Sequence, residues 1–82
     1  MPTTPQDMPG TEIARRLFEI GRTQAGIARI LGVAPFTVGR VLHGYGSSER
    51  IERAIAEAIG LPWEKVFAGR AYKRAQRFAV NG

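Results

Sequence analysis

The apolar residues of this chain recur at the spacing of helix faces, and glycine or proline separates one set from the next. Ile13, Leu17 and Ile20 follow the i, i+4, i+7 pattern of a helix. No stretch alternates apolar and polar residues as a half-buried strand does. The pattern therefore predicts an all-α fold of five short helices. The inward residues expected in the four later helices are Ile27, Ala28 and Leu31; Val38, Val41 and Leu42; Ile51, Ala54, Ile55, Ala58 and Ile59; and Trp63, Val66 and Phe67.

Residues suited to helix ends flank these apolar sets. The expected starts are Thr11, Thr23, Pro35, Ser47 or Ser48, and Pro62, and the expected ends are Gly21, Gly32 and Gly60. Three of the five prolines fall in residues 1–10, so we expect a flexible arm there that adds nothing to the core. Residues 11–67 are predicted to form one compact domain, and residues 68–82 a C-terminal tail.

Length and composition exclude several classes of function. The 82 residues allow a single domain, and they include no cysteine and one histidine. Disulfide, thiolate-metal and thiol redox sites are therefore excluded, and we expect no metal, no cofactor, no small-molecule ligand and no enzymatic activity. No apolar run reaches the roughly 18 residues of a membrane span, and the N-terminal residues lack the pattern of an export signal. We expect a cytoplasmic protein that does not bind membranes.

The net charge of +5 is unevenly distributed. Residues 1–67 hold eight basic and seven acidic side chains, whereas residues 68–82 hold four basic and no acidic ones. The four basic residues share one face if the tail becomes helical, and they are Arg70, Lys73, Arg74 and Arg77. Beside a nearly neutral domain, they predict a clamp for DNA phosphates. The alternative is a solvated tail, or one that orders against a dimer partner.

Residues 24–44 combine two helical patterns with a tight turn. Gly32 can adopt a positive φ without steric cost, and Ala28 is small enough for two helices to approach closely. Val33 is placed to fill the corner between the helices, and Val38 to pack back onto it. These features predict a helix-turn-helix, in which the second helix enters the major groove of DNA.

The same stretch resembles the lambda-repressor-like (Cro/CI, XRE) helix-turn-helix family. The shared pattern is Gln24, Ala28, Gly32-Val33 and the Leu42-x-Gly44 ending, and the resemblance extends over about residues 11–67. The Ala-Pro-Phe-Thr turn and the ending VFAGRAY are also similar to the small Ner-type phage regulators. The resemblance implies a compact five-helix DNA-binding domain.

It also implies base contacts at Pro35, Phe36, Gly39 and Arg40. The Arg40 guanidinium can bond guanine O6 and N7, Phe36 can offer an apolar face to a thymine methyl group, and Gly39 allows close approach. The residues themselves allow two alternatives. Phe36 would be a core residue if the helix were rotated, and Arg40 would be engaged if it paired with an acid such as Glu49.

Further residues are candidates for DNA phosphate contacts. Gln24 opens the second helix, and the resemblance implies that it holds the DNA backbone and braces the recognition helix. For His43 and the serines before the fourth helix, helix capping is the alternative role. The full set of phosphate candidates is Arg22, Thr23, Gln24, Thr37, His43, Ser48 and Arg50.

So short a helix needs less apolar surface than Trp63, Val66 and Phe67 provide, so we expect a homodimer interface there, formed either in solution or only on DNA. The sequence as a whole predicts a sequence-specific, double-stranded-DNA-binding transcriptional regulator, of the phage or prophage repressor type. One alternative is a DNA-binding antitoxin or other partner-binding regulator. The other is a basic module that binds RNA or membrane surfaces.

Overall fold

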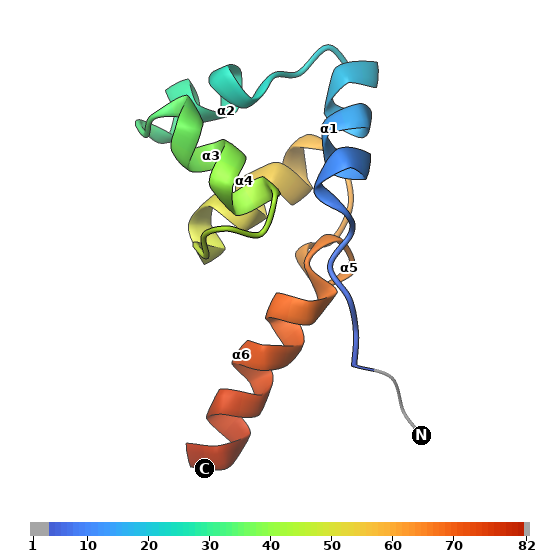
Figure 1. The fold of residues 1–82 in the computed structure, drawn as a ribbon, viewed down its shortest axis with the longest axis vertical. Coiled ribbons are helices and arrows are strands. Elements are labelled where there is room, and N and C mark those ends of the chain that lie inside the picture. Colours follow the sequence, from blue (N-terminus) through green and yellow to red (C-terminus); the bar gives the residue numbers. More distant parts are fainter. Residues whose placement is uncertain (1–3, 82) are drawn as a thin grey trace.

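The computed structural model describes residues 4–81, with the side chains of residues 4–77, and every regular element in this part of the chain is a helix. The helices are α1 (Gly10–Glu19), α2 (Gln24–Leu31), α3 (Pro35–Leu42), α4 (Glu49–Ala58), α5 (Trp63–Val66) and α6 (Ala68–Asn81). Figure 1 shows α1 to α4 gathered together, with α6 leading away from them. The all-α prediction is confirmed for these residues. The five expected helices correspond to α1 to α5, and the expected tail differs from the prediction because it forms a sixth helix.

Side-chain caps and one glycine set the helix ends around the second and fourth helices. The Thr23 hydroxyl accepts a hydrogen bond from the Gly26 amide at 2.9 Å, and Ser48 caps α4 in the same way. Gly32 has φ of 72°, so the turn after α2 uses the left-handed conformation that glycine adopts at no steric cost. These ends are as predicted. The first helix instead begins at Gly10, with Pro9 at its cap.

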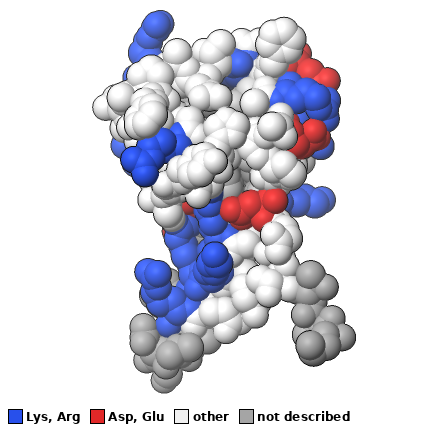
Figure 2. All heavy atoms as spheres, viewed as in Figure 1, with Lys and Arg blue, Asp and Glu red and all other residues white. Residues whose placement is uncertain are grey.

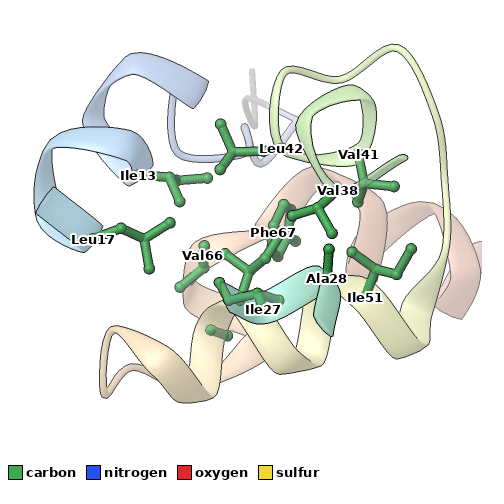
Figure 3. Packing of buried hydrophobic residues seen from close by; sticks show 12 residues of the cluster. Ile13, Leu17, Ile27, Ala28, Val38, Val41, Leu42, Ile51, Val66 and Phe67 are labelled. Carbon is green, nitrogen blue, oxygen red and sulfur yellow. The ribbon is translucent and has the colours of Figure 1, made fainter. Parts of the chain in front are cut away.

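The core forms where five helices meet. Figure 3 shows side chains from these helices packed around Phe67, which is fully buried. Among the expected inward residues, Ile20 is exposed, which differs from the prediction. The half-buried ones pack against the core, and they are Leu31, Ala54, Ala58, Ile59 and Trp63. The buried apolar residues are Ile13, Leu17, Ile27, Ala28, Val38, Val41, Leu42, Ile51, Ile55, Ala56, Val66 and Phe67.

α2 and α3 meet at a bend of 115°. Residues 32–34 join them, and the Val33 amide donates to the Ala28 carbonyl at 3.0 Å, which closes the end of α2 against the turn. Val38 is completely buried behind this corner, so the outer side of α3 is left open to solvent.

Within residues 4–81, no single helix is long and apolar enough to span a membrane. α2 and α3 reach that length and composition only as this bent pair.

The N-terminal residues that the structure describes are docked against α5 and α6. The Met8 amide donates to the Val66 carbonyl at 2.7 Å, and the Met8 side chain packs against the core. The Asp7 carboxylate accepts a hydrogen bond from the Arg70 amide at 3.0 Å, in the first turn of α6. The expectation of an arm without core contacts is therefore wrong for Met8, and Asp7 is held against α6. Residues 1–3 of the expected arm lie outside the described residues.

Candidate nucleic-acid interface

The exposed side of α3 carries the residues that were predicted to contact bases. Phe36 is 75% exposed, which rules out the alternative that it belongs to the core. Pro35 and Arg40 are also exposed, and Gly39 is half-buried. The Arg40 Nη2 donates to the Tyr45 carbonyl at 3.0 Å, and its guanidinium lies 5.9 Å from the centre of the Phe36 ring. Arg40 thus bonds a carbonyl of the following loop and not the Glu49 carboxylate.

A shallow hollow of about 420 Å³ lies on this face. It brings together α2, α3 and the loop after α3. Tyr45 is 77% exposed here and was not predicted as a site residue, although an aromatic residue between two glycines is a signal that the sequence carries. The lining residues are Gln24, Pro35, Phe36, Gly39, Arg40, His43 and Tyr45.

Acidic residues are absent from the sequence around this face. No Asp or Glu occurs between Glu19 and Glu49, a stretch that includes all of α2, α3 and the loop after them. The acids near α1 are paired within that helix, where Arg15 bonds both Glu12 and Glu19. Figure 2 shows the red atoms mainly on the α1 side, whereas the surface over α2 and α3 is uncharged or basic. A polyanion would meet no repulsion from side chains of this stretch.

Several of the predicted phosphate contacts already have a role inside the fold. The Arg50 Nη2 donates to the Leu31 carbonyl at 2.9 Å, which satisfies the last turn of α2. Ser48 and Thr23 cap α4 and α2, and His43 occupies the end position of α3. Arg22 and Thr37 are exposed at the edges of the α2–α3 pair.

A buried carboxylate, which no sequence pattern indicated, holds α6 in place. Glu52 of α4 is fully buried although it is charged. Its Oε1 accepts from Arg74 Nη1 at 2.6 Å and from the Trp63 indole nitrogen at 3.1 Å. Its Oε2 accepts from the Ser48 amide at 3.1 Å and lies 3.5 Å from Arg70 Nη1. A buried carboxylate needs such partners on both oxygens, and Glu52 has them.

The pKa of Glu52 reflects two opposing effects. Burial raises the pKa of this carboxyl group, but hydrogen bonds from Arg74 and Trp63 and the charges of Arg74 and Arg70 lower it by more. The pKa of Glu52 is therefore below its ordinary value, and the same hydrogen bond raises the pKa of Arg74. Glu52 is a stable anion at neutral pH.

This arrangement divides the predicted phosphate clamp in two. Arg70 is paired with Asp7 at 3.0 Å as well as with Glu52, and Arg74 also donates to the Ser47 hydroxyl at 3.0 Å. Both guanidiniums are thus paired with groups of the folded chain. The prediction of a loose tail with four cations free to bind phosphates is therefore wrong. Lys73 and Arg77 are exposed on α6.

The predicted dimer surface is also occupied by the fold. Val66 and Phe67 are completely buried in the core, so they cannot form an interface while the protomer stays folded. Two guanidiniums lie near the Trp63 ring, with Arg53 at 4.3 Å and Arg74 at 5.6 Å from its centre. The apolar residues Trp63, Val66 and Phe67, which the sequence predicted at a dimer interface, instead join α6 to the rest of the protomer.

Within the described residues, no group of three or more His, Asp and Glu side chains is placed to hold a metal ion. No protein-family model matches this chain, and no curated protein is significantly similar to it in sequence.

Proposed function

We propose that this protein is a sequence-specific, double-stranded-DNA-binding transcriptional regulator of the lambda-repressor-like helix-turn-helix type. The observation that carries the proposal is the α2–α3 pair. Its 115° bend and three-residue turn at Gly32 agree with the roughly 90–120° and short glycine-containing turn of helix-turn-helix units. In this proposal α3 enters the major groove, and the protein represses transcription in the phage or prophage manner by occupying an operator.

The exposed residues of α3 supply the chemistry for base recognition. The Arg40 fork would bond guanine O6 and N7, and the exposed Phe36 ring would contact a thymine methyl group. Arg40 must first leave the Tyr45 carbonyl. An exchange of one hydrogen bond for another costs little, because a net protein hydrogen bond contributes only about 0.5–1.5 kcal/mol.

The cations of α6 that remain exposed complete the proposed interface. Figure 2 shows basic side chains along α6 on the face of the molecule that also presents α3. Lys73 and Arg77 are exposed and would reach DNA phosphates, whereas Arg70 and Arg74 would hold the helix that carries them. The proposed clamp thus has two free cations on a fixed helix.

A homodimer belongs to the same proposal. One α3 with a single long donor fork specifies a short site, and two-fold pairing would double it, with half-sites about 10 bp apart. Because Val66 and Phe67 are buried, the paired surface would use other residues. Sedimentation of the protein alone and with operator duplex would show whether two chains assemble.

Selection of bound sites from random DNA duplexes tests the proposal. We expect a short enriched sequence that contains a guanine, with affinity well above that for a scrambled duplex of the same composition. Single-stranded RNA and anionic vesicles are the comparison ligands, because a basic surface binds both without sequence preference. Equal affinity for all of these ligands, or the absence of any enriched sequence, would contradict the proposal.

A further inference from the structure

Gln24 of α2 lies across a glycine of α3. The Gln24 Oε1 is 3.0 Å from the position that a Cβ atom on Gly39 would occupy. Real Cβ atoms rarely come this close to a neighbouring atom, so the Gln24 amide fills the space that the missing side chain of Gly39 leaves. Gly39 thus contributes no group of its own to the outer face of α3, and Gln24 stands in its place.

The Gln24 amide is also available for a ligand. It lines the same 420 Å³ hollow as Phe36 and Arg40, although it belongs to a different helix. In the described part of the chain, the Gln24 side chain takes part in no hydrogen bond, whereas Arg40 is bonded to the Tyr45 carbonyl. An amide carries both a donor and an acceptor, which is the pair that the major-groove edge of adenine requires.

We infer that Gln24 is a base-reading residue that specifies adenine across Gly39, and that Gly39 acts as its positioning residue. This inference rests on the proposed function and assigns Gln24 a role other than the phosphate contact expected from the sequence. The Gln24 oxygen accepts from adenine N6, and its nitrogen donates to adenine N7. Arg40 of α3 would thus contact one base, and Gln24 of α2 would contact a second.

Two substitutions of Gln24 separate base reading from phosphate binding at the selected site. Gln24→Ala should reduce the preference for adenine at one position by roughly 5- to 140-fold, the range of one bidentate base contact, and leave the other positions unchanged. Gln24→Lys retains a donor for phosphate but cannot present the paired amide. It should lose the same preference for adenine while it keeps its affinity for non-operator DNA.

Gly39→Ala tests the positioning role. The new methyl group would displace the Gln24 amide, so the preference for adenine should fall at the same base position. In the Gln24→Ala background the alanine at position 39 should change that preference no further, because the displaced group is already gone. Far-ultraviolet circular dichroism and Trp63 fluorescence confirm that each variant is folded.

Binding measured for every base at that position, at several salt concentrations, gives a clear decision. A loss confined to adenine, shared by Gln24→Ala and Gly39→Ala and not additive, supports the inference. An even loss for all bases with Gln24→Ala, together with a salt slope lower by about 0.9, would overturn it in favour of a phosphate contact. Wild-type protein without any sequence preference would instead overturn the proposed function, and this inference with it.

Discussion

The α2–α3 pair and the junction between α4 and α6 are held together in different ways. α2 and α3 meet through small and branched apolar residues, with Ala28 and Val38 buried at the corner. α6 is joined to the body through the Glu52 carboxylate, which binds Arg70 and Arg74. The first contact depends on volume and the second on charge. The same small protein thus combines a corner that tolerates change of pH with a junction that depends on ionisation.

This difference changes how the basic C-terminal residues are understood. Counting charges along the chain gives four cations in residues 68–82. The structure turns Arg70 and Arg74 inward and leaves Lys73 and Arg77 exposed. One basic segment thus has two cations that hold it to the body and two that face solvent, and a buried acid elsewhere in the chain decides which are which.

Loss of the Glu52 charge should have the largest effect on stability. Glu52→Gln removes the buried carboxylate that Arg70 and Arg74 share, and breaking a buried ion pair costs about 3–5 kcal/mol. Arg70 keeps its pair with Asp7, and Glu49 remains 3.9 Å from Arg74. We expect the free energy of unfolding to fall by about 3 kcal/mol, because both guanidiniums keep some contact with solvent. Urea unfolding followed by the fluorescence of Trp63, the only tryptophan, measures the change.

The matched control for that variant is Glu57→Gln on the same helix. Glu57 is exposed, so its substitution should change stability by no more than about 0.5 kcal/mol. Equal effects of the two substitutions would show that α6 is not anchored by Glu52.

Acid should weaken the α4–α6 junction in the wild-type protein. The loss in unfolding free energy should be no larger than that caused by Glu52→Gln. The folded-state pKa of Glu52 lies below its ordinary value, so its contribution is complete above the pKa of the unfolded chain. That contribution is lost as the pH falls through the folded-state pKa. The difference in unfolding free energy between wild type and Glu52→Gln should therefore shrink from pH 7 to pH 3. A difference that stays constant over this range would contradict the assignment.

A substitution in the turn between α2 and α3 should lower stability through backbone strain alone. Gly32 has a positive φ, and no atom lies within 4 Å of where its Cβ would be, so Gly32→Ala introduces strain without a clash. We expect a loss of about 1–2 kcal/mol in thermal or urea unfolding. Gly32→Asn should lose less, because asparagine adopts this conformation more readily. Equal stability of the alanine variant and wild type would show that the turn is not constrained.

The exposed cations of α6 should alter DNA binding and leave stability unchanged. Replacing both Lys73 and Arg77 with alanine removes two proposed phosphate contacts, so the slope of log affinity against log salt should decrease by about 1.8. Operator and non-operator duplexes should be weakened alike. An unchanged slope in a folded double variant would make these two residues part of a solvated surface only.

Most of the fold could be predicted from the sequence because apolar periodicity and caps act locally. Thr23, Gly32, Pro35 and Ser48 end or begin helices through contacts with residues a few positions away. The same local rules predicted that Val38 is buried, whereas the outward position of Phe36 was decided only by the structure, which excludes the rotated helix.

The α6 junction could not be predicted in this way. Asp7 and Arg70 are 63 positions apart, and Arg74 and Glu52 are 22 apart, so no local pattern indicates that they pair. Glu52 directly follows the buried Ile51 in α4, and the sequence pattern alone indicates a solvated charge at this position. The Gln24 contact over Gly39 was missed for the same reason, since it joins two helices across a space that only the folded chain defines.

The affinity of Arg40→Ala for the selected duplex tests the central claim, that α3 reads DNA, most directly. Arg15→Ala is the matched control, because it removes the same charge from the α1 surface, where Arg15 pairs with Glu12 and Glu19. We predict that Arg40→Ala lowers operator affinity by about 1–3 kcal/mol and relaxes the preference at one guanine, while Arg15→Ala retains that preference. Equal behaviour of the two variants, with the guanine preference intact in both, would contradict the account.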